Sequence, residues 1–117
     1  MFSLSSTDRY YFYSQPTDMR KSFDSLSGIV QTQMGCNPTN GSVYVFVNKR
    51  RDRIKLLHWE QGGYVLYYKR LEKGVIEWPP LTEGCWQISW TTLMLIIEGI
   101  RIKSIQKFPR FSLKKEP

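Results

Sequence analysis

The sequence has few of the side chains from which catalytic and metal sites are usually built. Among 117 residues it has one histidine, His58, two cysteines, Cys36 and Cys85, and ten acidic residues. The cysteines lack CxxC spacing and have no histidine cluster nearby, which argues against a zinc site. A metal-dependent nuclease needs several carboxylates that converge on two metal ions, whereas the acids here fall in predicted caps, turns and salt bridges. We therefore predict no catalytic residue, no metal site and no cofactor.

Other familiar signals are also missing. The sequence contains no GxxxxGK[ST], GxGxxG or GxSxG motif. Its longest apolar runs, such as Leu93 to Ile97, are far shorter than the ~20 residues of a membrane-spanning helix. The N-terminus lacks the basic start and long apolar run of a secretion signal, and the two cysteines are most simply free thiols. We expect a cytoplasmic protein that does not contact a membrane.

Positive charge is what the sequence has in excess. Lys and Arg number 17 against 10 Asp and Glu, a formal net charge of +7. The excess is clustered, because residues 49–55 hold five basic residues against one acid and residues 101–117 hold six against one. Such clusters favour nucleic acid or another polyanion as a partner. A chain of this length forms one domain, and we predict it over residues 1–102, followed by a basic tail over residues 103–117.

Three strand-like segments between Ser42 and Leu71 carry aromatic and basic residues at every second position. Asn48–Arg53 joins the first pair and Glu60–Gly63 joins the second, and neither loop has room for a helix. These segments predict an antiparallel β-meander. If residues 49–52 form a four-residue loop, Tyr44 lies opposite Leu57.

Alternation along the strands sorts the meander into two faces. One face is mostly aliphatic and carries Val43, Val45, Val47, Ile54, Leu56, His58, Val65, Tyr67, Lys69 and Leu71. The other is aromatic and basic and carries Tyr44, Phe46, Arg53, Lys55, Leu57, Trp59, Tyr64, Leu66, Tyr68 and Arg70. We expect the aliphatic face to pack on a helix and the aromatic–basic face to be a contact surface. A one-residue error in the loop would scramble this partition.

The remaining segments complete an α+β fold of about four to five strands and two helices. We predict a first strand over Arg9–Tyr13 and a short fourth strand around Val75–Trp78. A first helix, capped by Thr17 or Asp18 and ending near Gly35, has apolar residues at spacings of three and four. Those residues are Met19, Phe23, Leu26, Ile29 and Val30. We predict that this stripe covers the aliphatic face of the meander.

A second, short helix is predicted over Trp90–Glu98. Ser89 is its expected cap and Gly99 its C-terminal stop. Leu93, Ile96 and Ile97 form its expected buried stripe.

The basic loop Lys49–Arg53 is the strongest functional signal. Charges spread over this loop and the adjoining strands can neutralise several phosphates together. The candidate nucleic-acid contacts are Lys49, Arg50, Arg51, Arg53, Lys55, Lys69 and Arg70. The competing interpretation is a solvated turn whose charges limit aggregation.

The aromatic residues and the histidine are weaker signals. Trp59, Tyr64 and Tyr68 are candidates for base stacking or partner contact, and also for a core position under the second helix. His58 falls on the aliphatic face, where we expect a partly buried ring with a satisfied hydrogen bond.

Several segments, in order along the chain, match the motifs of one family. They are PTDMRKSFDSL (16–26), VFVNKRRDRIKLL (45–57), WEQGGY (59–64), YKRLE (68–72) and LIIEGI (95–100). In these segments the chain resembles TnpB, the accessory-protein family encoded by the second reading frame of insertion-sequence sixty-six elements. The resemblance covers about Arg9 to Ile102. It departs from the family pattern at Ser25, where glycine is usual, and at residues 37–41, where NPTNG replaces DPFSG.

The resemblance implies a role in transposition beside a separate, catalytic transposase of the same element. Its implied partners are the DNA of the element ends, the transposase and other proteins of the element. We therefore predict a non-catalytic accessory protein that binds DNA through the basic hairpin. The alternative is an adaptor that binds transposase with little direct DNA contact, and a metal-dependent nuclease is a third interpretation.

Overall fold

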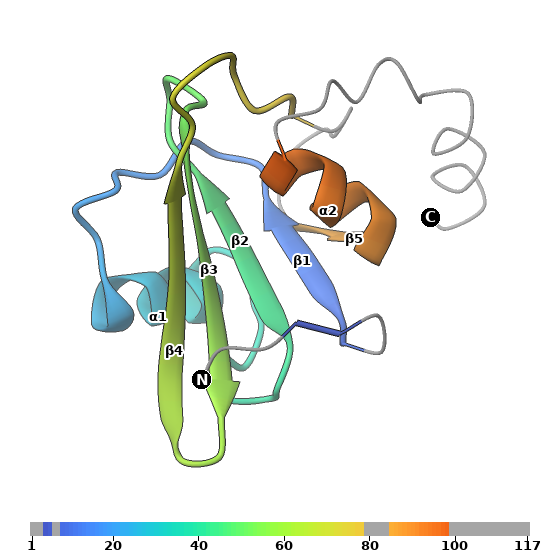
Figure 1. Cartoon of the computed structure of the whole chain (residues 1–117). Helices are drawn as coiled ribbons and strands as arrows, with labels where there is room; N and C mark the ends of the chain where they lie inside the picture. The colour runs from blue at the N-terminus through green and yellow to red at the C-terminus, as the bar shows by residue number, and fades with distance from the viewer. Residues whose placement is uncertain (1–3, 6–7, 79–84, 99–117) are drawn as a thin grey trace.

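A five-stranded sheet separates two helices in the computed structural model, which describes residues 4–5, 8–78 and 85–98 (Figure 1). The elements follow the chain as β1 (Tyr10–Tyr13), α1 (Phe23–Thr32), β2 (Val43–Val47), β3 (Arg53–Glu60), β4 (Gly63–Arg70), β5 (Cys85–Ile88) and α2 (Trp90–Glu98). The strands lie in the order β4-β3-β2-β1-β5. The predicted α+β class is confirmed.

The meander of β2, β3 and β4 is antiparallel, with the predicted register. Tyr44 pairs with Leu57 across β2 and β3, and Trp59 pairs with Tyr64 across β3 and β4. Short loops enforce this register, because each leaves its strands only one way to pair. The sorting of strand residues into two faces is therefore confirmed.

The sheet is mixed, because β1 runs parallel to β2. A parallel pair needs a crossover connection, and residues 14–42 with α1 supply it. The predicted strand around Val75–Trp78 is wrong, since those residues are not in a strand. The fifth strand is instead β5, which pairs antiparallel with β1. The backbone near Val75 contacts the basic hairpin, because the Ile76 amide donates a hydrogen bond to the Arg51 carbonyl at 2.6 Å.

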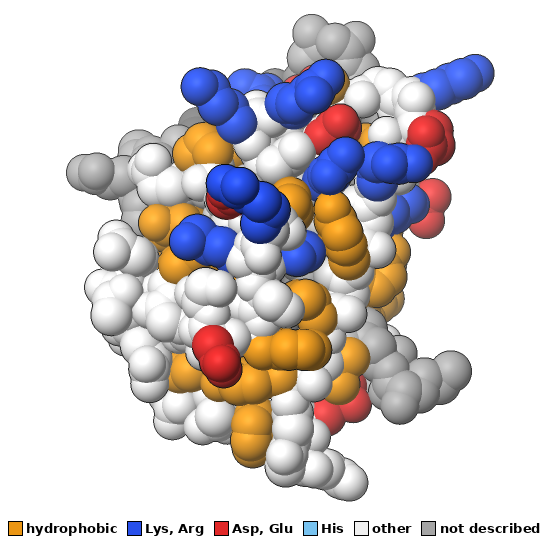
Figure 2. Space-filling view, turned by 90° about the vertical axis from the view of Figure 1, so that its left-hand side faces the viewer, with side chains coloured by type: hydrophobic (Ala, Val, Ile, Leu, Met, Phe, Trp, Pro, Cys, Tyr) orange, Lys and Arg blue, Asp and Glu red, His pale blue; other side chains and the backbone are white. Residues whose placement is uncertain are grey.

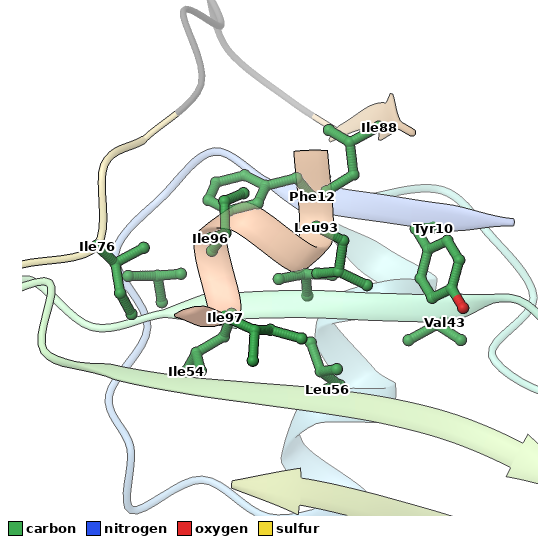
Figure 3. Close-up of a cluster of buried hydrophobic side chains, with 12 residues drawn as sticks. Tyr10, Phe12, Val43, Ile54, Leu56, Ile76, Ile88, Leu93, Ile96 and Ile97 are labelled. Atoms are coloured by element: carbon green, nitrogen blue, oxygen red, sulfur yellow. The ribbon is translucent and has the colours of Figure 1, made fainter. Parts of the chain in front are cut away.

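The two helices cover the faces in the reverse of the predicted assignment. The aliphatic face packs under α2, in a core that includes Phe12, Val43 and Leu56 (Figure 3). The helix α1 packs instead on the aromatic–basic face, in a cluster with Tyr44, Phe46, Leu57, Leu26 and Val30. Figure 1 shows the chain crossing behind the sheet from β1 to β2, the side that a right-handed crossover requires. The parallel pairing of β1 and β2 therefore decides which face α1 covers.

The helix α1 begins later than predicted. Ser22 is its N-cap, and the Ser22 amide donates to Ser25 Oγ at 3.3 Å. Phe23 is the first helical residue and its side chain is 43% exposed, so its predicted place in the core is also wrong. The helix ends near Gly35 as predicted, where φ is +67°, a conformation that favours glycine.

The second helix confirms its prediction within the described residues. Ser89 Oγ accepts a hydrogen bond from the Thr92 amide at 3.0 Å, which makes it the N-terminal cap. Leu93, Ile96 and Ile97 are buried against β1 and β3 (Figure 3). The predicted stop at Gly99 and the predicted tail, residues 103–117, lie outside the described residues. Among the described helices, none is long and apolar enough to span a membrane.

Candidate nucleic-acid interface

The loop between β2 and β3 is held in shape by the side chain of Asn48. Asn48 Oδ1 accepts hydrogen bonds from the amides of Asp52 and Arg53, both at 3.0 Å, and Asn48 Nδ2 donates to Asp52 Oδ1 at 2.7 Å. Arg51 adopts a left-handed backbone with φ at +62°, which is uncommon for a residue with a side chain. The loop therefore presents its charges from a defined conformation.

Asp52 serves this loop as a hydrogen-bond acceptor. The Asn48 hydrogen bond, aided by the charges of Arg50 and Arg53, lowers the pKa of the Asp52 carboxyl. The carboxylate stays ionised at neutral pH and is already engaged by Asn48.

The segment after β4 supports the loop from one side. The Leu71 amide donates to the Asp52 carbonyl at 2.7 Å, and the Ile76 amide donates to the Arg51 carbonyl. The Arg51 guanidinium carbon lies 5.9 Å from the ring centroid of Trp78, within cation–π range. Arg51 is thus partly engaged within the protein, although it remains exposed.

A second loop, residues 14–22 between β1 and α1, lies beside the hairpin loop. The Thr17 amide donates to the Val47 carbonyl at the end of β2, at 2.9 Å. Asp18 accepts from the Arg20 amide at 2.9 Å and forms an ion pair with the Arg20 guanidinium at 2.7 Å. The hydrogen bond from the Arg20 side chain is the main cause that lowers the pKa of Asp18 to about 2. Arg20 was not among the predicted contacts, because this loop was predicted to be part of the helix; the Asp18-x-Arg20 turn was the available signal.

The two loops border a hollow of about 650 Å³. Its lining includes four cations and two acids, namely Arg20, Lys49, Arg50, Arg53, Asp18 and Asp52, together with the ring of Tyr68. We call this hollow the cationic cleft. Both acids are engaged, Asp18 by Arg20 and Asp52 by Asn48. Figure 2 shows this side of the molecule, with Lys and Arg side chains gathered over its upper half and hydrophobic side chains between them.

Of the predicted basic contacts, Lys49, Arg50 and Arg53 line the cationic cleft. Arg70 lines a smaller neighbouring hollow of about 300 Å³ and pairs with Glu72, with Arg70 Nε 3.0 Å from Glu72 Oε2. The structure therefore brings three of the seven predicted residues into one site and places Arg70 beside it.

Lys55 and Lys69 have their ammonium groups engaged inside the protein. Lys55 is only 6% exposed, and its Nζ donates to the carbonyls of Met19 and Lys21, both at 2.7 Å. It fastens residues 14–22 to the sheet. Lys69 Nζ donates to the Ile97 carbonyl at 2.8 Å, at the C-terminal end of α2, where helix carbonyls lack intrahelical partners. Neither residue is among those that line the cationic cleft.

The three candidate aromatic residues are separated. Tyr68 is 50% exposed and lines the cationic cleft. Trp59 and Tyr64 lie at the opposite end of β3 and β4, where their rings meet edge to face with centroids 4.9 Å apart. Tyr64 packs against the cluster beneath α1, so this pair does not lie under the second helix. Of the three, only Tyr68 shares a site with the basic residues.

His58 has the predicted environment. Its ring is buried, with Nε2 3.1 Å from the Gly41 carbonyl and Nδ1 3.1 Å from Glu60 Oε2. Cys36 and Cys85 are free thiols, and burial is the main cause that raises the pKa of Cys85 to about 12. In the described part of the chain, no group of three or more His, Cys, Asp or Glu side chains is arranged to hold a metal ion.

Comparisons with known proteins found a matching family model and similar proteins. The family model described as "IS66 Orf2 like protein" matches residues 8–107. Two similar proteins come from Sinorhizobium fredii, and both carry the description uncharacterized protein. The protein y4jC is 29% identical over 96 residues, covering 82% of each chain, and y4hO is 34% identical over 93 residues, covering 79% of this chain and 80% of its own. No solved structure matches this chain.

Proposed function

We propose that this chain, which belongs to the IS66 Orf2-like family of transposition-associated proteins, is a non-catalytic accessory factor that binds DNA. Membership of this family indicates that the process is transposition. The mechanism we propose is neutralisation of DNA phosphates by the cations of the cationic cleft, while a separate transposase carries out the chemistry on the strands.

The observation that carries this proposal is the convergence of two loops on one hollow. Arg20 comes from the loop before α1, whereas Lys49, Arg50 and Arg53 come from the loop between β2 and β3. Asn48 fixes the second loop, and Lys55 ties the first to the sheet. Cations presented from loops of defined backbone conformation suit the repeating charge of a phosphate backbone.

The contacts that the nearby carboxylates already make support the proposal that the protein is not catalytic. A two-metal site for phosphodiester chemistry needs carboxylates free to bind divalent ions. Both oxygens of Asp18 accept hydrogen bonds from Arg20, so a metal ion at Asp18 would have to displace that side chain. Asp52 accepts a hydrogen bond from Asn48 through Oδ1. Purified protein incubated with supercoiled DNA and Mg²⁺ or Mn²⁺ should leave the DNA uncut.

A second candidate role is binding of the transposase, and the edge of the sheet favours it. The eight-residue strand β4 is the last in the strand order and, among the described strands, pairs only with β3. Its outer edge can receive an extended segment of another protein through backbone hydrogen bonds. If the protein acts in this role, it should associate with DNA only when the transposase is present.

A salt titration separates the two roles. Binding should be measured for DNA of the element ends and for unrelated DNA, with and without the transposase. Direct contact predicts binding without transposase, with log K falling linearly against log salt. Lys73→Ala removes an exposed charge that does not line the cationic cleft, so this variant should bind DNA as the unaltered protein does. DNA association seen only with transposase present would favour the adaptor role and contradict our proposal.

A further inference from the structure

Tyr68 stands between two hollows on the surface. Its side chain lines both the cationic cleft and the smaller hollow of about 300 Å³, and Arg53 is the other residue common to the two. Because β4 is an edge strand, the ring lies near the border of the sheet. Tyr68 and Arg53 therefore form a ridge, with the cationic cleft on one side and Arg70, which is paired with Glu72, on the other.

The ring of Tyr68 is supported from within the protein. The Lys55 ammonium lies 4.7 Å from its centroid, and Lys55 is itself anchored by the carbonyls of Met19 and Lys21. Arg53 Nη1 donates to the Tyr68 hydroxyl at 3.3 Å. A buried ammonium can occupy only one face of the ring, and half of the side chain remains accessible. The arrangement presents an aromatic surface that is oriented and backed by positive charge.

We infer that Tyr68 is a stacking platform for an unpaired base, and that the ligand of this site is single-stranded DNA. This inference rests on the proposed function and narrows it from DNA in general to an unpaired stretch. In this arrangement the base lies on the Tyr68 ring, and the phosphates on its two sides lie near Arg50 and Arg70. Aromatic rings within cationic grooves bind single strands in this way, with little dependence on sequence.

Double-stranded DNA fits the ridge poorly. In a duplex each base is stacked between its neighbours and paired with its partner, so an aromatic ring on the protein surface can reach a base face only after that base leaves the stack. The loop cations alone would suffice for the backbone of a duplex, and nothing in that contact needs Tyr68. The exposed ring beside the cations therefore favours the single strand.

The test uses fluorescence anisotropy with a labelled oligodeoxynucleotide of about 12 nucleotides and with the blunt duplex of the same sequence, at equal salt. Tyr68→Leu keeps an apolar side chain but removes the aromatic face. We expect single-strand affinity to fall about tenfold or more and duplex affinity to stay within about twofold. Tyr68→Trp should restore the preference, and Phe23→Leu, at an exposed ring that lines neither hollow, should change neither affinity.

A second measurement uses the unaltered protein, so it does not depend on the folding of a variant. A 2-aminopurine base is placed at successive positions of the oligonucleotide, and its fluorescence is followed on saturation with protein. Because stacking depends little on sequence, the strand can bind in several registers, and stacking on Tyr68 predicts strong quenching at most internal positions. Uniform, weak quenching along the strand would overturn the inference.

The remaining outcomes distinguish this inference from the proposed function. If Lys49→Ala with Arg50→Ala weakens binding of both DNA forms while Tyr68→Leu weakens neither, DNA binding stands and the stacking platform is wrong. If Tyr68→Leu weakens both forms equally, Tyr68 is a general contact and the single-strand assignment fails. If the unaltered protein binds neither form, both proposals fail.

Discussion

The two faces of the sheet are covered to different extents, and the difference locates the candidate site. On the aliphatic face, α2 lies over Val45, Ile54 and Leu56, and these side chains are almost completely buried. On the aromatic–basic face, α1 covers the middle of the sheet, including Tyr44 and Leu57. It leaves open the end near the β2–β3 loop, where Tyr68 and Arg70 are exposed. The first face is core over β2 and β3, whereas the second is half core and half contact surface.

What separates the two halves of the second face is the connection between β1 and α1. Residues 14–22 do not extend the helix; they form a loop that runs beside the hairpin and is tied down by Thr17 and Lys55. A helix beginning at Asp18 would place helical backbone where this loop now borders the cleft. The late start of α1 thus allows the cationic cleft to exist.

The largest expected effects come from residues buried on either face. Leu26→Ala in α1 and Leu56→Ala in β3 each remove a completely buried side chain, and each should lower the free energy of unfolding by about 2–5 kcal/mol. Urea denaturation measures both. Phe23→Ala should cost under about 1 kcal/mol, because that ring is exposed and surface substitutions cost little. If Phe23→Ala proved as costly as Leu26→Ala, our description of the face that α1 buries would be wrong.

A smaller effect is expected at Lys55, which joins the two halves of the second face. Lys55→Met keeps most of the side-chain volume but removes the ammonium that donates to two carbonyls. We expect a loss of about 1.5–3 kcal/mol in the free energy of unfolding, the usual range for a hydrogen bond to a charged group. Lys21→Met, at an exposed lysine, is the matched control and should be nearly neutral. Equal, negligible effects would mean that Lys55 does not fasten the loop.

The smallest effect is expected in the stability of the protein at acid pH, where Asp18 becomes protonated. Arg20 lowers the pKa of Asp18 to about 2 from its ordinary value near 3.8. A carboxyl with a depressed pKa in the folded state stabilises the protein above the unfolded value, and this contribution is lost as the pH falls from about 4 through about 2. The side chain is solvent-exposed, so the change in stability should be slight. An NMR titration should place the Asp18 midpoint near 2 and return it toward 3.8 in Arg20→Ala; equal midpoints would contradict the ion pair.

Local patterns were enough to predict the meander and the second helix. The β2–β3 and β3–β4 loops are too short for any other pairing, so alternation gave the correct faces. Ser89 followed by Leu93, Ile96 and Ile97 is a complete local signal for a capped, amphipathic helix.

The side on which α1 packs could not be predicted in the same way. It depends on the parallel pairing of β1 with β2, a contact between segments about 30 residues apart that no local pattern records. The same is true of β5, which is only four residues long and pairs with the other side of β1. The sheet was predicted as an antiparallel meander of about four to five strands, and such a sheet contains no parallel pair, so neither the pairing of β1 with β2 nor that of β1 with β5 was predicted.

Only part of the candidate site was predicted, because contacts between segments that are distant in the sequence were again not recorded in local patterns. Lys49, Arg50 and Arg53 were found because they are clustered in the sequence. Arg20 was missed because it joins them only through folding, and Lys55 was counted as exposed because its carbonyl partners lie 34 and 36 residues away. Charge clustering identified the right loop but did not separate cations that line a cleft from those that bond to the backbone.

DNA binding by the cationic cleft can be tested through the salt dependence of the affinity of a double variant. Lys49→Ala with Arg50→Ala removes two of the four cations of the cationic cleft and no buried side chain. For duplex DNA, our account predicts weaker binding across sequences and a slope of log K against log salt that is flatter by roughly 1.8, or about 0.9 for each lost phosphate contact. An unchanged affinity and slope, in a variant whose urea denaturation matches that of the unaltered protein, would contradict it.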